Sequence, residues 1–203
     1  MDFHTLNRTA LSQFTKYPRT TPEMVVFVAQ KAEQVITCDP RSVSSNSTDE
    51  HGNIIPLPSM VNFVASIVVQ SQAPVSTLMT SAVYLDRLQA FLPPDARGMR
   101  CTGHRIFLSC LMLAAKIHND LCPCNRHWAR YSSRVKGFRG FGFSMRDVNL
   151  MERQLLMLLR WDLRVQEEDL TRVLEPFLAP IRHEIDVDTS EWYAELETPI
   201  PDE

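Results

Sequence analysis

Apolar residues recur every three or four positions through most of the segment 57–162, and this spacing predicts helices. No segment alternates apolar and polar side chains with the period of two that is typical of strands. The sequence therefore predicts an all-α fold. Within this segment the helices are expected over 58–71, 74–91, 102–121, 126–131 and 144–162.

The predicted helix at 102–121 is apolar on most of its circumference. Ile106 and Ile117 lie on its main apolar face, and Phe107 and Leu111 add apolar side chains on other faces. A helix that is hydrophobic nearly all round is typical of the centre of a bundle. We therefore expect this helix to be central.

The segments before residue 57 have weaker signals. Thr21-Pro22-Glu23 predicts a helix start, with Thr as N-cap, Pro in the first position and an acid in the first turn. The helix is expected over 22–36. Residues 38–56 are polar and rich in turn-forming residues, which predicts a linker.

The C-terminal part is expected to begin with a helix at 167–178 that Pro180 ends. Residues 184–203 contain eight Asp or Glu and no Lys or Arg, and such a composition favours disorder. The predicted organisation is therefore an N-terminal helix and linker at 1–56, a helical domain with its C-terminal helix at 57–180 and an acidic, disordered tail at 181–203.

Composition excludes several classes of protein. The 203 residues are 44% hydrophobic with a net charge of −3, so the chain can bury a core and is not a polyanion binder as a whole. Five irregularly spaced cysteines do not predict a disulfide framework. No apolar run approaches the roughly 18 residues of a membrane span. We also do not expect a secretory signal, because the first residues form neither a basic nor an apolar stretch. We expect a protein of the nucleus and/or cytoplasm, with no membrane partner.

Positive charge is concentrated in the segment 97–139, where nine Lys or Arg accompany one acid, Asp120. Such a surface could recruit acidic or phosphorylated partners, although a solvated face is the commoner explanation. Nucleic acid is therefore not expected as a partner.

Two charged residues interrupt apolar helical stretches, Lys116 and Glu152. Charged residues in such positions are usually solvated at the edge of a helix. If the two helices lie side by side, the two charges would instead meet at a surface and offer an ammonium donor and a carboxylate acceptor to a partner helix. Ile117 adjoins Lys116, and Leu156 follows Glu152 on the same helical face, so apolar side chains would flank the pair.

A metal site is a second interpretation. Zinc ligand types gather in one part of the chain, at Cys101, His104, His118, Cys122, Cys124 and His127. The Cys-x-Cys spacing does not match the usual zinc knuckle, however, and Pro123 stiffens it. A helix end followed by a turn explains the same residues, so no metal and no cofactor are expected.

The glycine- and phenylalanine-rich segment 137–143 is expected to be an inserted, mobile loop. A phosphate cradle would need a preceding strand and a Gly-Lys-Ser/Thr sequence, which are missing here. Stacking of its aromatic residues on single-stranded nucleic acid is a further possibility. No Ser/His/Asp or Cys/His set is evident along the chain, so an enzyme is not expected.

Several segments resemble the cyclin box in the right order and spacing. The segment 77–88 resembles its second helix and 104–116 its third, while 125–131 and 149–156 resemble the fourth and fifth. The sequences His104-Arg105-Ile106-Phe107-Leu108 and His127-Trp128-Ala129 are similar to the fungal PCL/PHO group of cyclins.

The resemblance implies a single five-helix cyclin box with additional N-terminal and C-terminal helices. It also implies that Lys116 and Glu152 bind the regulatory αC helix of a cyclin-dependent kinase, on a surface that includes Leu113, Ile117 and Leu156. The partners would be that kinase and the protein substrates of the complex, and the pathway would be cell-cycle or nutrient (phosphate) signalling.

The sequence also departs from the family pattern. Many cyclins have a Met-Arg-x-Ile-Leu substrate-docking patch, whereas this chain has Met60-Val61-Asn62-Phe63-Val64, without the arginine. No second box fits after Asp162. Two alternatives stay open: a cyclin-box adaptor that assembles transcription or nucleic-acid complexes without activating a kinase, and a zinc-stabilised interaction module.

Overall fold

Helices make up nearly all the regular structure of the computed structural model, which describes residues 2–17, 19–42, 48 and 53–197. The chain divides into two compact units. One consists of residues 19–165, and the other combines the described parts of 1–18 and 166–203. The predicted all-α fold is confirmed.

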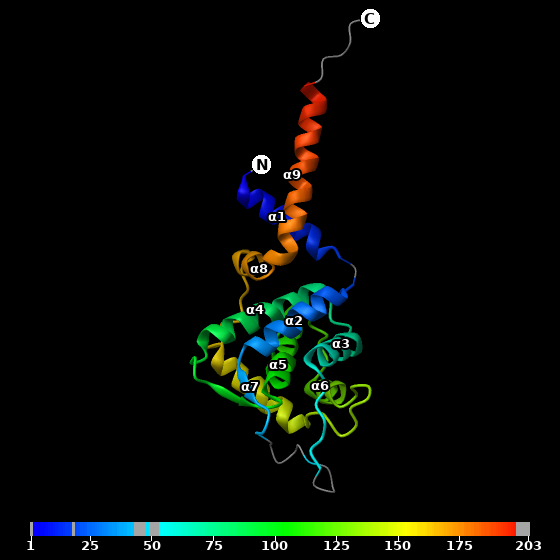
Figure 1. Cartoon of the computed structure of the whole chain (residues 1–203), viewed down its shortest axis with the longest axis vertical. Coiled ribbons are helices and arrows are strands. Elements are labelled where there is room, and N and C mark those ends of the chain that lie inside the picture. Colours follow the sequence, from blue (N-terminus) through cyan, green and yellow to red (C-terminus); the bar gives the residue numbers. More distant parts are fainter. Residues whose placement is uncertain (1, 18, 43–47, 49–52, 198–203) are drawn as a thin grey trace, which may run out of the picture. The chain divides into compact units, whose positions relative to one another are not determined.

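The unit 19–165 is a helical bundle built around one central helix. Its helices are α2 (Pro22–Gln34), α3 (Met60–Ser71), α4 (Val75–Phe91), α5 (Thr102–His118), α6 (Asn125–Ser132) and α7 (Met145–Leu158). The helix α5 contacts each of the other five, which lie around it in Figure 1. The five helices α3 to α7 form the expected five-helix box, and α2 packs on α3, α4 and α5 as an additional N-terminal helix.

Local sequence signals fix the starts of two of these helices. The Thr21 hydroxyl accepts a hydrogen bond from the Met24 amide, which caps α2. Ser144 and Asp147 form the reciprocal capping box at the start of α7. These bonds satisfy backbone N–H donors that a helix N-terminus otherwise leaves unpaired. Both α2 and α7 therefore begin where the sequence predicts.

The glycine- and phenylalanine-rich segment is part of the core. Phe141 and Phe143 are buried, and their rings lie 5.7 and 6.3 Å from the Phe63 ring in edge-on contacts. Gly142 has a φ of 151°, and a Cβ there would lie 2.7 Å from the Ser133 backbone. The segment is a loop, as expected, but the expected mobility is contradicted because two of its aromatic side chains are packed in the core.

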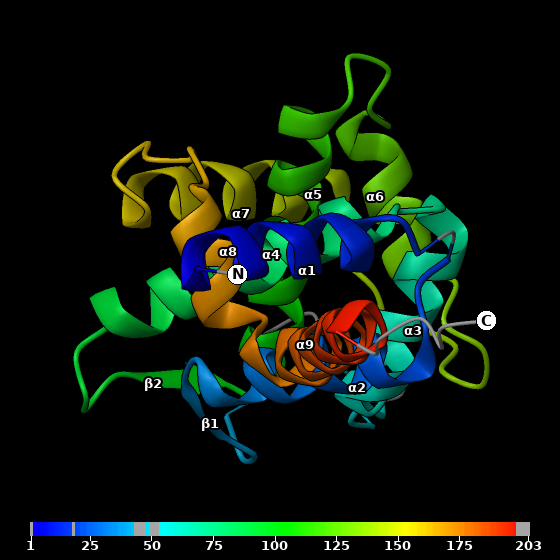
Figure 2. The ribbon, with the colours of Figure 1, turned by 90° about the horizontal axis from the view of Figure 1, so that it is seen from above.

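Two short strands complete this unit. β1 (Thr37–Asp39) pairs in parallel with β2 (Arg97–Met99), as Figure 2 shows, with Thr37 opposite Arg97. β1 lies at the start of the predicted linker 38–56. Part of that linker, residues 43–47 and 49–52, lies outside the described residues.

The second unit contains α1 (Phe3–Thr15), α8 (Glu167–Val173) and α9 (Glu175–Glu197). The Phe14 ring packs 5.4 Å from the Phe177 ring, and Arg182 Nη1 donates to Asn7 Oδ1 at 3.0 Å. These contacts tie α9 to α1. The sequence pattern had given no clear signal for α1.

The structure corrects the expected C-terminal boundary. Pro180 lies inside α9 and does not end it, and residues 181–197 are helical where a disordered tail was expected. Packing of α9 on α1 on both sides of Pro180 offsets the one backbone hydrogen bond that proline removes. Residues 198–203 of the predicted tail lie outside the described residues. The boundaries also differ from 56/57 and 180/181, because α2 belongs with the box and α8 with α1.

Candidate partner-binding surface

Lys116 and Glu152 meet at the surface of the box. Lys116 lies in the last turn of α5 and Glu152 in the middle of α7, and their side chains form an ion pair across 36 positions of sequence. Both side chains are partly buried. The expected meeting of these two charges is confirmed, and it results from the packing of α5 against α7.

Asn125 joins the two charged groups into one network. Its Oδ1 accepts a hydrogen bond from Lys116 Nζ at 2.8 Å, and its Nδ2 donates to Glu152 Oε2 at 2.6 Å. The same Nδ2 also donates to Asn149 Oδ1 at 2.7 Å. A single amide thus holds both the ammonium and the carboxylate, which restricts the rotamers of two long side chains before any partner arrives.

Sequence reasoning did not identify Asn125 and Asn149 as part of this surface. Asn149 precedes Glu152 by three positions, so it lies on the same face of α7, and this spacing could have indicated it. Asn125 is the first residue of α6, directly after the Cys-Pro-Cys turn. Its position depends on how that turn returns the chain to α5, which no local pattern specifies.

The apolar side chains beside the network differ in how far they are exposed to solvent. Ile117 is 51% exposed next to Lys116, and Leu156 is half-buried one turn beyond Glu152. Leu113, one turn before Ile117, is only 3% exposed. Ile117 and Leu156 can therefore contact a partner directly, whereas Leu113 lies in the core and supports the surface from below.

Residues of the alternative zinc interpretation have hydrogen-bond partners within the fold. His118 Nε2 hydrogen-bonds to Thr80 Oγ1 at 2.8 Å, and His104 Nε2 hydrogen-bonds to the Pro58 carbonyl at 2.9 Å. Cys124 Sγ lies 3.2 Å from His127 Nδ1. Among the described residues, no three His, Cys, Asp or Glu side chains are grouped to hold a metal ion.

Burial adjusts two titratable groups beside the network. It lowers the pKa of His118 below its ordinary value of 6.5. Burial also raises the pKa of the Cys122 thiol, against the opposing effect of the Lys116 charge.

Several cations of the segment 97–139 have partners within the fold. Arg105 forms an ion pair with Asp147 at 3.4 Å, and Arg100 donates to the Ile55 carbonyl. Lys116 is paired with Glu152. The cluster of positive charge in the sequence is therefore partly neutralised in the structure.

In the part of the chain that the structure describes, no helix is long and apolar enough to cross a membrane.

Comparison with known proteins finds matches to cyclins. Residues 26–164 match the family described as cyclin, N-terminal domain. The chain is similar to PHO85 cyclin-1 of Saccharomyces cerevisiae, with 41% identity over 176 residues that cover 87% of this chain and 60% of that protein. PHO85 cyclin-9 and PHO85 cyclin-2 of the same organism are 36% and 35% identical, and the match covers 53% of each.

The matched region coincides with the helical bundle. It begins in α2 and ends after α7, so it contains the whole network formed by Lys116, Asn125, Asn149 and Glu152. The chain spans between half and two thirds of the length of these curated relatives.

Proposed function

Because this chain belongs to the cyclin family, we propose that it binds a cyclin-dependent protein kinase and activates it through the surface formed by Lys116, Glu152, Asn125, Ile117 and Leu156. The observation that carries the proposal is the network in which Asn125 holds the Lys116 ammonium and the Glu152 carboxylate together beside an exposed isoleucine. A charged clamp with apolar neighbours is the usual composition of a helix-binding surface.

The clamp retains bonding capacity for a partner. An ammonium has three N–H donors, of which Glu152 and Asn125 use two, so Lys116 keeps one for a backbone carbonyl. Each Glu152 oxygen accepts one bond and keeps a lone pair for a backbone N–H. The N-terminus of a helix leaves N–H groups unpaired, which would donate to Glu152, whereas its C-terminus leaves carbonyls unpaired. The Lys116 ammonium would therefore bind a carbonyl at the other end of αC or in the backbone that adjoins the helix.

Activation follows from differential binding to two states of the kinase. A kinase is inactive while the αC glutamate is turned away from the ATP-binding lysine. A subunit that binds the inward state of αC more tightly shifts the population towards that state. A shift from 1:99 to 99:1 requires roughly 5.5 kcal/mol of differential binding. The chemistry of phosphoryl transfer then takes place on the kinase, and this chain acts as a regulatory subunit.

The names of the relatives suggest the kind of kinase. The chain is similar to three proteins named PHO85 cyclins, so we propose a PHO85-type kinase as the partner and the protein substrates of that kinase as the further partners of the complex.

Binding to the purified PHO85-type kinase tests this function. We expect the wild-type chain to bind and the double variant Lys116→Ala, Glu152→Ala to lose binding by at least about tenfold, because truncation removes both charged groups from the interface. A matched control is the pair Lys31 and Asp86, which is similarly buried in the same unit with an N–O distance of 3.2 Å. Its double alanine variant should bind like the wild type. Equal losses in both variants, with both folded, would contradict the proposed surface, and no binding by the wild type would favour the adaptor alternative.

A further inference from the structure

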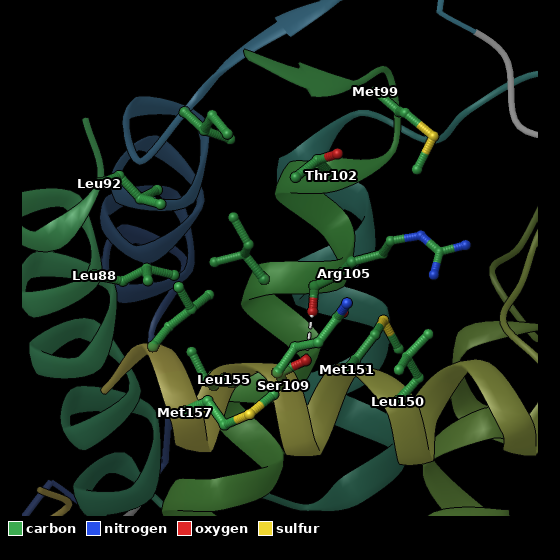
Figure 3. Close-up of a pocket in the computed structure, with 14 residues that line it drawn as sticks. Leu88, Leu92, Met99, Thr102, Arg105, Ser109, Leu150, Met151, Leu155 and Met157 are labelled. Atoms are coloured by element: carbon green, nitrogen blue, oxygen red, sulfur yellow. Dashed lines mark hydrogen bonds between the residues drawn. The ribbon is translucent and has the colours of Figure 1, made fainter. Parts of the chain in front are cut away.

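An apolar groove lies between α4, α5 and α7, away from the Lys116–Glu152 surface. It encloses about 610 Å³. Figure 3 shows Leu88 of α4 and Leu92 directly after that helix on one side, Leu150, Met151, Leu155 and Met157 of α7 below, and Met99 above. All of its lining residues belong to the unit 19–165.

The groove and the Lys116–Glu152 surface use different faces of α7. Leu150, Gln154 and Leu158 follow one another at intervals of four and line the groove. Glu152 is two positions from Leu150, a rotation of about 200° around the helix. A partner in the groove therefore would not compete with a partner bound at Glu152 for the same face of this helix.

Large apolar side chains at the groove are exposed to solvent. Exposed fractions are 62% for Met157, 45% for Leu158, 44% for Leu150 and 37% for Met99. Single exposed apolar residues are common, but a contiguous group around a concave surface indicates an interaction site. Methionine in particular adapts to partners of varied shape.

Four of the fourteen residues that line the groove are polar, Thr102, Arg105, Ser109 and Gln154, and two of these are bonded within the fold. The Ser109 hydroxyl donates to the Arg105 carbonyl of its own helix at 2.8 Å, as the dashed line in Figure 3 shows. The Arg105 guanidinium is paired with Asp147. The groove thus offers apolar contact area with little directed hydrogen bonding, which suits the apolar side chains of a peptide better than a polar small molecule.

The rim of the groove along α7 is positively charged. Arg146 and Arg153 are exposed and lie seven residues apart, so they share one stripe of the helix, next to Leu150 and Met157. Arg160 lies just beyond the end of α7 and stacks 5.1 Å over the Phe91 ring at the end of α4. The acids of α7 do not neutralise this stripe, because Asp147 pairs with Arg105 and Glu152 with Lys116.

We propose that this groove docks an acidic, amphipathic segment of a partner protein, with two or three large apolar side chains in the groove and carboxylates against Arg146 and Arg153. Charge complementarity selects this occupant. A second copy of the chain placed across a two-fold axis would bring the same arginine stripe against itself, which disfavours the groove as a dimer interface.

Selection from a displayed library of random 16-residue peptides tests the proposal. The library is panned on the full chain after depletion on the variant Met157→Glu, which places a carboxylate at the groove. We expect the enriched peptides to combine at least two large apolar residues with a net negative charge. A synthetic enriched peptide, measured by fluorescence anisotropy, should lose about tenfold or more in affinity with Met157→Glu and severalfold with Arg153→Glu, and added salt should weaken its binding.

Val69→Glu is the matched control, because Val69 is 76% exposed on α3, away from the groove. This variant should bind the peptide like the wild type. Circular dichroism melting of all three variants verifies that each is folded. Three results would overturn the proposal: no enrichment specific to the wild type, enriched peptides without acidic excess, or a wild-type dimer in analytical ultracentrifugation that Met157→Glu dissociates.

Discussion

Asn125 donates a hydrogen bond of 2.6 Å to Glu152, the carboxylate that also pairs with Lys116. The amide of Asn125 therefore connects three helices, because Lys116 lies on α5, Asn125 on α6 and Glu152 on α7. Two flexible charged side chains are held in one geometry without a partner, so less conformational entropy remains to be lost on binding.

Replacement of Asn125 tests this role directly. We expect Asn125→Ala to weaken binding of the kinase by about tenfold, since it removes hydrogen bonds from both charged groups of the clamp while leaving their charges in place. Because Lys116 and Glu152 keep their charges in this variant, any loss of affinity reports how the two side chains are positioned and not how strongly their charges attract the partner. Isothermal titration calorimetry would report the loss mainly as a less favourable binding entropy. An unchanged affinity in a folded variant would show that Asn125 does not position the pair.

The exposed isoleucine beside the clamp provides a second prediction. Ile117→Asp should reduce kinase binding by about tenfold or more, because it places a carboxylate where an apolar contact is proposed. Val69→Asp introduces the same charge on an exposed position of α3 and should leave binding unchanged. Biolayer interferometry with immobilised kinase compares the two. Similar effects of both substitutions would argue against a specific contact at Ile117.

The sequence predicted the box well where local patterns and packing agree. The uniformly apolar helix containing Phe107 and Leu111 is central in the structure, and Thr21 and Ser144 cap the helices they were expected to cap. The positions of Lys116 and Glu152 on apolar helices favoured two solvated residues, and the resemblance to the cyclin box was needed to favour their meeting at a surface. Asn125 was missed, since its role depends on the three-dimensional path of the turn before α6.

The segments that were predicted wrongly depend on long-range contacts. Glycines at 137, 140 and 142 predict a mobile loop by composition, yet Phe141 and Phe143 pack against Phe63, which is nearly 80 positions away in sequence. Pro180 predicts a helix end by its missing amide, but contacts with α1 sustain the helix through it. Neither partner lies within the window that a local pattern covers.

The packed glycine- and phenylalanine-rich segment leads to a stability prediction. Gly142→Ala should lower the free energy of unfolding by at least about 2 kcal/mol, because φ is 151° and the new Cβ would lie 2.7 Å from backbone atoms of Ser133. Gly137→Ala should cost only about 1 kcal/mol, since φ is 85° but no atom lies within 4 Å. Urea unfolding measures both. Equal effects would indicate that the segment is not packed as described.

The buried histidine of the core predicts a dependence of stability on pH. Burial lowers the pKa of His104 below the ordinary value of 6.5, and the nearby Arg100 charge adds to this effect. Below pH 6.5 the unfolded chain therefore binds a proton that the native chain does not, and stability falls as the pH falls towards the native pKa. Above pH 6.5 this contribution is fully present.

Comparison of the wild type with His104→Gln isolates this effect, because glutamine can still donate to the Pro58 carbonyl but does not titrate. The difference in unfolding free energy between the two proteins should change between pH 7 and pH 5, with the wild type losing more stability. A constant difference across this range would show that His104 does not remain neutral in the native state.

Kinase activation is the central claim of the proposed function, and one titration tests it most directly. A fixed amount of the PHO85-type kinase is mixed with increasing amounts of this chain, and phosphorylation of a peptide substrate is measured beside kinase binding in the same samples. We predict that activity rises in parallel with occupancy for the wild type and stays at the basal level for Lys116→Ala, Glu152→Ala. Saturating binding of the wild type without any rise in activity would contradict the account.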